Sequence, residues 1–196
     1  MVLAAGENAR LPADELGTVV FVREGAVKLV GHVGADREQI VAFGFAGEML
    51  SFSVSSRSTY SLWSMTASKL LAIPASRLID AAASDSNLLQ AWFTRTVSMI
   101  ERSRAKAVML GRKTARERLA TFLCAMADRI GRQAGSAVVI TLPMSRREIA
   151  DSLGITIETV SRQFTDLREL GVVETRGRSE VRVIDMARLH RLAAFA

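Results

Sequence analysis

This sequence of 196 residues has little cysteine, histidine or proline, with counts of one, two and three. The single cysteine, Cys124, forms no disulfide within the chain and cannot supply a zinc cluster or a four-cysteine iron–sulfur centre. The sequence also lacks a phosphate-binding glycine loop, a nucleophile elbow and a suggestive pair of carboxylates. We therefore expect no metal, no cofactor and no enzymatic activity.

Long apolar runs are missing as well. No stretch approaches the ~20 apolar residues that a helix needs to cross a bilayer. The first residues, MVLAAGENAR, show no basic segment followed by an apolar run, so no secretory signal is predicted. Since hydrophobic residues still make up 49% of the chain, a packed core is expected, and the combination predicts a cytoplasmic protein.

Positive charge is unevenly distributed over the chain, whose net charge is +6. Lys and Arg exceed Asp and Glu by one (11 against 10) in residues 1–110 and by five (15 against 10) in residues 111–196. A basic second half predicts a polyanionic partner, with nucleic acid as the first expectation and a membrane surface as the second. A solvated, arginine-rich surface without a partner is the alternative.

Residues 17–73 carry the pattern of short strands. The segments TVVFV, AVKLVGHV and REQIVAF are rich in valine and isoleucine and are separated by REG and GAD, which are typical of turns. A further extended pattern, YSLWSMTASKLLAIP, ends at Pro74. Several short strands joined by glycine turns predict a small antiparallel barrel or roll within residues 1–84.

Residues 85–110 show the heptad spacing of a helix that packs against a second helix. Seven positions, alternately four and three residues apart, form what we call the heptad seam: Leu89, Phe93, Thr96, Ile100, Ser103, Ala107 and Leu110. Its small and polar members favour close contact between helices, so a dimerisation helix is predicted. The alternative is a helix that packs on its own sheet, which Trp92 and Met99 beside the seam favour in part.

A domain boundary is predicted after residue 110, because Gly111 is expected to break the helix. Thr114 and Glu117 then form a T-x-x-E capping box, which predicts a helix over residues 115–132. The following segment, GRQAGSAVV, is interpreted as a connector. The predicted domains are therefore residues 1–84, the helix at 85–110 and a second domain at 111–196.

The stretch SRREIADSLGITIETVSRQF predicts a helix-turn-helix. Ser145 and Glu148 form a capping box at the start of its first helix, and Gly154 stands where a left-handed backbone ends that helix. Thr156 is suited to cap the second helix. The buried side is predicted from the spacing of its apolar residues, which are Ile149, Leu153, Val160, Phe164 and Leu167.

The segment GVVETRGRSEVRVID predicts a β-hairpin with strands at 172–175 and 180–184 and a turn at Gly177. A hairpin directly after a helix-turn-helix is a wing. Its arginines, Arg176, Arg178 and Arg182, are placed to contact DNA phosphates. Each of them is alternatively a solvated residue of a turn.

The second helix presents Glu158, Ser161 and Arg162 on the face opposite its buried residues. Arginine binds guanine with two hydrogen bonds, glutamate accepts from cytosine and serine is a short adaptable contact, so these three residues are the predicted base-reading set. The predicted phosphate contacts near them are Arg146, Arg147, Thr156 and Gln163. The alternative for Glu158 and Arg162, four residues apart, is a surface ion pair.

The stretch LPMSRREIADSLGITIETVSRQFTDLRELGVV, with the wing after it, closely resembles the DNA-binding domain of the Crp/Fnr transcription regulators. Its ETVSR segment is similar to the Fnr/FixK branch, in which an E-x-x-S-R pattern reads TTGA-type half-sites. Glu158, Ser161 and Arg162 match that pattern one by one. The cyclic-AMP receptor branch carries an arginine before the glutamate, where this sequence has Ile157.

The resemblance extends over most of the chain. REGAVKLVGHVGADREQIVAFGFAGEML is similar to the β-roll of these bacterial regulators, and MLGRKTARERLATFLCAMADR to the end of their dimer helix and their hinge. It implies an α+β protein with an N-terminal antiparallel, cupin-like β-roll, a long dimerisation helix and a C-terminal winged helix-turn-helix. It also implies a homodimer on double-stranded DNA, with RNA polymerase as a further partner of those members that activate transcription.

The roll departs from the family pattern where a signal would bind. Nucleotide-binding members carry Gly-Glu a few residues after the turn that Gly47–Glu48 forms here, but this sequence has Ser51–Phe52. The cassette around Arg57–Ser58 is shortened, and the roll is expected to be a strand or two shorter than its relatives. We therefore expect no cyclic nucleotide. His32 is interpreted as a surface residue rather than a haem ligand.

Two hypotheses follow for the function. The first is a homodimeric, sequence-specific transcription regulator that recognises an inverted repeat of TTGA-type half-sites. The alternative is a regulator of the same family gated by a small ligand, neither cyclic AMP nor an iron–sulfur cluster, near Phe52, Thr59, Trp63 and Ser103. Cys124, within LATFLCAMA, is interpreted as a core residue. Activation and repression both stay open.

Overall fold

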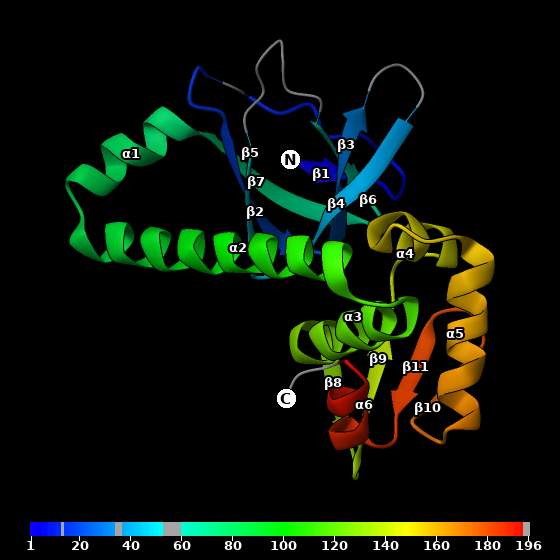
Figure 1. Ribbon diagram of the computed structural model, residues 1–196. Helices are drawn as coiled ribbons and strands as arrows, with labels where there is room; N and C mark the ends of the chain where they lie inside the picture. The colour runs from blue at the N-terminus through cyan, green and yellow to red at the C-terminus, as the bar shows by residue number, and fades with distance from the viewer. Residues whose placement is uncertain (13, 34–36, 53–59, 194–196) are drawn as a thin grey trace. The chain divides into compact units, whose positions relative to one another are not determined.

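The computed structural model of the protein describes residues 1–12, 14–33, 37–52 and 60–193. The chain forms two compact units, residues 1–105 and residues 106–196, and each contains both strands and helices. The predicted α+β architecture, with an antiparallel roll followed by helices and a winged helix-turn-helix, is confirmed (Figure 1). None of the helices in the described part of the chain combines the length and apolar character required to traverse a bilayer.

The first unit is built from two antiparallel sheets. One sheet has the order β1-β7-β2-β5 and the other the order β4-β3-β6 (Figure 1). The strands are β1 (Val2–Leu3), β2 (Thr18–Glu24), β3 (Ala26–Val33), β4 (Arg37–Phe45), β5 (Met49–Phe52), β6 (Tyr60–Ser64) and β7 (Ser68–Pro74). Valine-rich segments such as TVVFV suit these strands because β-branched side chains pack well on a pleated surface.

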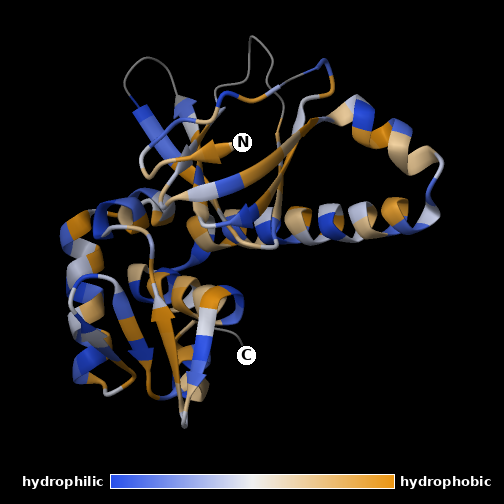
Figure 2. Cartoon of the chain, turned by 180° about the vertical axis from the view of Figure 1, so that it is seen from behind, coloured by the Kyte–Doolittle hydropathy of each residue, from blue (hydrophilic) through white to orange (hydrophobic). Residues whose placement is uncertain are grey.

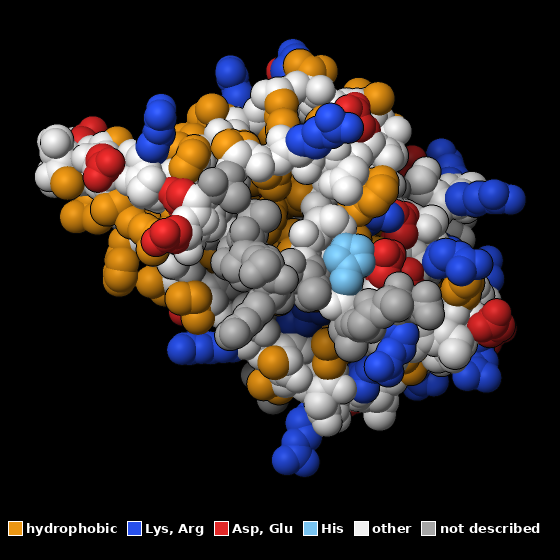
Figure 3. Space-filling view, turned by 90° about the horizontal axis from the view of Figure 1, so that it is seen from above, with side chains coloured by type: hydrophobic (Ala, Val, Ile, Leu, Met, Phe, Trp, Pro, Cys, Tyr) orange, Lys and Arg blue, Asp and Glu red, His pale blue; other side chains and the backbone are white. Residues whose placement is uncertain are grey.

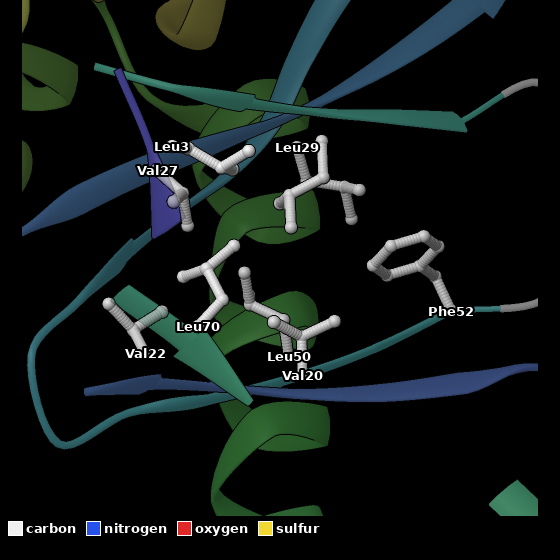
Figure 4. Close-up of a cluster of buried hydrophobic side chains, with 9 residues drawn as sticks. Leu3, Val20, Val22, Val27, Leu29, Leu50, Phe52 and Leu70 are labelled. Carbon is white, nitrogen blue, oxygen red and sulfur yellow. The ribbon is translucent and has the colours of Figure 1, made fainter. Parts of the chain in front are cut away.

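Apolar side chains from both sheets meet between them and form the core of the roll (Figure 4). The strands β2, β3 and β5 each contribute alternate residues, as Val20 and Val22 do on β2. The core cluster comprises Leu3, Val20, Val22, Val27, Leu29, Leu50, Phe52, Leu62 and Leu70. Burial of each such side chain stabilises the fold by roughly 1.5–3 kcal/mol relative to exposure.

Two helices follow the roll in sequence. The helix α1 (Ala75–Ala83) begins directly after Pro74, and α2 (Ser86–Arg112) begins three residues after α1 ends. Leu88 and Trp92 of α2 pack against a second apolar cluster that includes Val19 and Met49, on the side of β2 opposite the roll core. Part of α2 therefore packs on its own sheet, as the alternative interpretation proposed.

The predicted helix break at Gly111 is wrong. The helix α2 continues through Gly111 to Arg112, and the Lys113 N–H still donates to the Met109 carbonyl at 3.1 Å. A glycine costs only about 1 kcal/mol relative to alanine inside a helix, and this residue lies in the last turn, so it does not stop the helix. The two compact units divide within α2, between Ala105 and Lys106.

Within the described residues, the second unit combines the end of α2 and four further helices with a four-stranded antiparallel sheet of order β10-β11-β9-β8. Its elements are α3 (Ala115–Ile130), β8 (Gly131–Ala134), β9 (Ala137–Thr141), α4 (Arg146–Leu153), α5 (Ile157–Glu169), β10 (Val173–Arg176), β11 (Glu180–Val183) and α6 (Met186–Leu192). Figure 2 shows the hydrophobic character of β9 in this sheet. The largest fully buried side chains of the unit are Leu119, Leu123, Met126, Ile140, Ile149, Leu153, Leu167 and Leu189.

The segment GRQAGSAVV is a hairpin, not the connector that the sequence suggested. Its two strands, β8 and β9, pair in antiparallel register around a turn at Gly135, and β9 pairs in turn with β11 of the wing. The run AVVIT provides the reason, because Ala137 and Ile140 are almost fully buried and anchor the hairpin in the core. The wing is thereby extended to four strands. The strand β1 and the helix α6 were not predicted either.

Candidate nucleic-acid interface

Side-chain caps define the start of both helices of the helix-turn-helix. The Ser145 Oγ accepts from the Glu148 N–H at 3.2 Å, and the Glu148 carboxylate accepts from the Ser145 N–H at 2.7 Å. The Thr156 Oγ1 accepts from the Thr159 N–H at 3.2 Å and caps α5 in the same way. The predicted capping box and cap are therefore confirmed, and they set where each helix begins.

The turn between α4 and α5 depends on glycine. Gly154 has φ +62°, a left-handed conformation that strains other residues, and its N–H donates to the Ala150 carbonyl. Ala150 is 1% exposed, and its small side chain permits the close crossing of the two helices. The apolar stripe predicted for the buried side is buried as expected at Ile149, Leu153, Val160, Phe164 and Leu167.

The predicted base-reading residues lie together on the exposed side of α5. Glu158, Ser161 and Arg162 are all exposed, in the first two turns of the helix. The Glu158 carboxyl has a lowered pKa because it accepts hydrogen bonds from its own backbone N–H and from the Thr156 side chain, so it is a charged acceptor. Within the described chain, Glu158 and Arg162 form no ion pair with each other.

The predicted phosphate contacts differ in their surroundings. Arg147 and Thr156 are exposed, whereas Arg146 is half-buried with its guanidinium 3.3 Å from the centroid of the Phe164 ring. Burial, with a smaller effect from the neighbouring charge of Arg168, lowers the pKa of Arg146 to about 10, so it is still charged at neutral pH. Its Nη1 is buried and has no hydrogen-bond partner within the described residues. This guanidinium connects α4 to α5 through a cation–π contact.

Gln163 does not suit the phosphate contact predicted for it. Its side chain is 9% exposed, and its Nε2 donates to the Asp166 carboxylate at 3.0 Å. The reason is its helical position, because residue 163 lies three residues after Val160 and directly before Phe164, both of which face the core. We therefore leave Gln163 out of the interface.

The wing presents arginines at and near its tip. The strands β10 and β11 pair in register from Val173 with Val183 to Arg176 with Glu180, and Gly177 turns the chain with φ +58°. Arg176 and Arg178 are exposed beside this turn. Arg182 is also exposed but lies further along β11, opposite Glu174, so the tip carries two of the three predicted arginines.

An apolar stripe on α2 is exposed, and we define it as Leu89, Phe93, Val97, Ile100 and Val108, with exposed fractions of 48%, 66%, 37%, 42% and 59%. Figure 3 shows hydrophobic side chains gathered at the surface over α1 and the start of α2. Ser103 and Ala107 of the predicted seam are exposed too. Val97 and Val108 were missed although Val97 lies four residues after Phe93, a spacing that identifies the same face.

Two other members of the predicted seam have partners within their own unit. The Thr96 hydroxyl donates to the Trp92 carbonyl at 2.9 Å, inside the helix. Leu110 is half-buried, and its Cδ2 lies 3.5 Å from the position that a Cβ would occupy on residue 154, where the chain has glycine. Leu110 therefore packs at the turn of the helix-turn-helix.

Of the residues proposed for a ligand pocket, the three that the structure describes do not come together. Phe52 points into the roll core (Figure 4), whereas Trp63 lies on the outer side of β6, next to the inward Leu62. The Trp63 Nε1 donates to Ser61 at 2.9 Å. Ser103 is exposed on α2, and Thr59, like Arg57 and Ser58, lies outside the described residues.

His32 has partners of its own on the surface of the roll. Its Nδ1 lies 3.1 Å from the Glu38 carboxylate and its Nε2 lies 2.8 Å from the Ser61 hydroxyl. These contacts orient the ring without a metal. In the described part of the chain, no group of three or more His, Cys, Asp or Glu residues is placed to hold a metal ion.

Cys124 is 3% exposed, and burial, with a smaller contribution from Asp128, raises the pKa of its thiol to about 11. At pH 8 the thiolate fraction is therefore ~0.1%, and we expect the native protein to react with Ellman's reagent at least ~100-fold more slowly than the unfolded chain. The control is a Ser136→Cys variant on a Cys124→Ser background, because Ser136 is exposed in the β8–β9 turn. Rapid labelling of native Cys124 would contradict the assignment as an inert core thiol.

The sequence of this chain is similar to those of known transcription regulators. Residues 117–192 match a family model described as a Crp-like helix-turn-helix domain. The chain is 36% identical over 175 residues to the nitrogen fixation regulation protein FixK of Azorhizobium caulinodans, covering 89% of this chain and 71% of that protein. It is 34% identical over 194 residues to the transcriptional activator protein anr of Pseudomonas aeruginosa, covering 97% and 79%.

Solved structures agree with these relatives. The structure of FixK2 from Bradyrhizobium japonicum superposes with a TM-score of 0.84 at 30% identity, over 100% of this chain and 97% of that chain. A CooA mutant from Carboxydothermus hydrogenoformans has a TM-score of 0.82 at 20% identity, over 99% and 87%, and supports the fold alone.

Proposed function

The chain belongs to the Crp/Fnr family of transcription regulators and is FixK-like, and from this premise we propose that it acts as a homodimer on inverted repeats of TTGA-type half-sites. One observation carries the proposal. Glu158, Ser161 and Arg162 share the exposed side of α5 in its first two turns, while the opposite side is packed into the core. In a helix-turn-helix these turns of the second helix face base edges in the major groove.

Each of the three side chains supports the reading of a TTGA-type half-site. Arg162 is free of Glu158 in the described chain and has the planar fork that binds the O6 and N7 of guanine. Glu158 is a charged acceptor suited to the amino group of cytosine, which pairs with that guanine. Ser161 is a short contact whose hydroxyl both donates and accepts, so it suits different base edges. Their sequence positions match the E-x-x-S-R pattern.

The wing and the start of α4 support the phosphate contacts. Arg176 and Arg178 are exposed at the wing tip, and Arg147 is exposed in the first turn of α4. Thr156 is exposed as the cap of α5. Contacts of this kind add affinity on any sequence and make it fall with salt. The excess of positive charge in the second half of the chain agrees with this role.

The exposed apolar stripe on α2 supports the homodimer. Apolar side chains at helical spacing, from Leu89 to Ile100, are exposed on a helix whose other side packs on the roll through Leu88 and Trp92. A second copy of α2 would bury this stripe and place two recognition helices on one inverted repeat.

We also propose that the protein acts in the cytoplasm, where DNA and RNA polymerase are available to it.

Binding of synthetic duplexes tests the proposal directly. Fluorescence anisotropy at physiological salt is expected to show binding of a TTGA inverted repeat at least ~10³-fold tighter than binding of a scrambled duplex of the same composition. The logarithm of the affinity for both duplexes is expected to fall linearly with the logarithm of the salt concentration. Equal affinity for the repeat and the scrambled duplex would refute sequence-specific binding.

A further inference from the structure

Arg118 of α3 is the side chain on which several distant backbone segments of the second unit converge. Its Nη2 donates to the Leu110 carbonyl at 2.8 Å and its Nε to the Lys113 carbonyl at 2.9 Å. Its Nη1 donates to the Leu153 carbonyl at 2.9 Å and reaches the Gly154 carbonyl at 3.5 Å. One guanidinium thus joins the end of α2, the α2–α3 connection and the turn of the helix-turn-helix.

The bonded carbonyls are those that a helix cannot satisfy by itself. Leu110 lies in the last turn of α2, which ends at Arg112, and Leu153 is the last residue of α4. The last four carbonyls of a helix have no partner in that helix, and a positive charge beside them is favourable. Arg118 therefore caps the C-terminal ends of two helices at once.

Two further contacts connect the end of α2 with the helix-turn-helix. The Lys106 Nζ donates to the Ser152 hydroxyl at 3.1 Å, and Ser152 is 5% exposed within α4. Leu110 packs next to Gly154, because the Leu110 Cδ2 lies 3.5 Å from the position that a Cβ would occupy on Gly154. The turn that positions α5 is therefore held from the α2 side by an apolar contact, a side-chain hydrogen bond and the Arg118 fork.

We propose that Arg118 is a positioning residue for DNA recognition, which orients the base-reading helix relative to the last turns of α2. This inference rests on the proposed homodimer, because α2 is the helix that would join the two copies. With Arg118 in place, the recognition helices stand at one separation and favour one spacing of the two half-sites. Without it, each helix-turn-helix still folds and reads a half-site, but its orientation to α2 varies.

The test compares Arg118→Met with Arg112→Met, which removes the same charge from an exposed residue at the end of α2. We expect Arg118→Met to bind the best-spaced inverted repeat at least ~10-fold more weakly, while a duplex with one half-site changes by less than ~3-fold, because only the repeat requires both sites to be engaged together. For Arg118→Met, the affinity for repeats with one base pair inserted or removed between the half-sites is expected to approach its affinity for the best-spaced repeat. Arg112→Met is expected to keep its preference for the best-spaced repeat.

Arg118→Lys separates geometry from charge. Lysine keeps the positive charge but lacks the planar fork that bonds several carbonyls at once, so it is expected to lose spacing preference as Arg118→Met does. Equal losses on the half-site and the repeat in Arg118→Met would reveal a general folding defect and overturn the proposal. Binding and spacing preference equal to those of Arg112→Met would overturn it as well.

Amide hydrogen exchange without DNA keeps this inference distinct from the proposed function. In Arg118→Met, the amides of residues 150–156 are expected to exchange at least ~10-fold faster than in Arg112→Met, because their local opening is no longer opposed by the fork. If the wild-type protein bound no TTGA repeat, the proposed function would be wrong. The exchange rates would still test whether Arg118 holds the turn of the helix-turn-helix to the end of α2. Unchanged exchange at these amides would overturn the positioning role.

Discussion

Arg162→Ala is expected to weaken binding to a TTGA inverted repeat by at least ~30-fold, because each of two half-sites loses a bidentate base contact worth ~1–3 kcal/mol. Arg162 is exposed in the second turn of α5 and forms no ion pair with Glu158 in the described chain, so its removal leaves the fold intact. Discrimination is expected to be lost mainly at one base pair of each half-site. Fluorescence anisotropy on a series of single-base variants of the repeat measures both effects.

Arg178→Ala is the matched control for that experiment. Arg178 is exposed beside the turn of the wing, where a phosphate contact is proposed. Its loss is expected to weaken repeat and scrambled duplexes alike and to reduce the salt slope by about one per protomer. Equal losses on both duplexes for Arg162→Ala as well would show that Arg162 does not read bases.

Phe93→Asp is expected to convert the protein to a monomer and to weaken binding of the inverted repeat at least ~100-fold, because the avidity of two linked sites is lost. Phe93 is 66% exposed, the largest exposed fraction in the apolar stripe on α2, so the change adds charge to the proposed interface without disturbing the core of the unit. Sedimentation velocity measures the change in oligomeric state, and anisotropy on the repeat measures the change in affinity.

Ile79→Asp provides the control for an exposed apolar residue outside the stripe. Ile79 is 41% exposed on α1, and its replacement by aspartate is expected to leave both the dimer and DNA binding unchanged. Binding of Phe93→Asp to a single half-site is expected to persist. A Phe93→Asp protein that sedimented as a dimer would place the interface elsewhere.

Local sequence signals were sufficient for the helix-turn-helix. Each of its signals involves residues that are only three or four positions apart in the chain. These signals are the capping box of Ser145 and Glu148, the left-handed Gly154 and the cap at Thr156. The valine-rich run TVVFV likewise predicts a strand from its own composition, but β2 is buried on both sides, with Val20 and Val22 in the roll core and Val19 in the cluster that α2 covers. Such features could be predicted since their causes lie in adjacent residues.

Contacts between distant segments could not be predicted in this way. Leu110 fits the heptad spacing of a dimer seam, but in the structure it packs at Gly154. The hairpin of β8 and β9 is held by the pairing of β9 with β11, about forty residues later in the chain, together with the burial of Ala137 and Ile140.

The sequence by itself determined which residues share the exposed side of α5 that we propose reads DNA, because Glu158, Ser161 and Arg162 follow a helical spacing. Only the tertiary structure decided how the turn before α5 is held. The fork of Arg118 bonds carbonyls of Leu110, Lys113 and Leu153, which come from three segments. Backbone carbonyls carry no sequence signature, so only the folded chain shows which of them one arginine reaches.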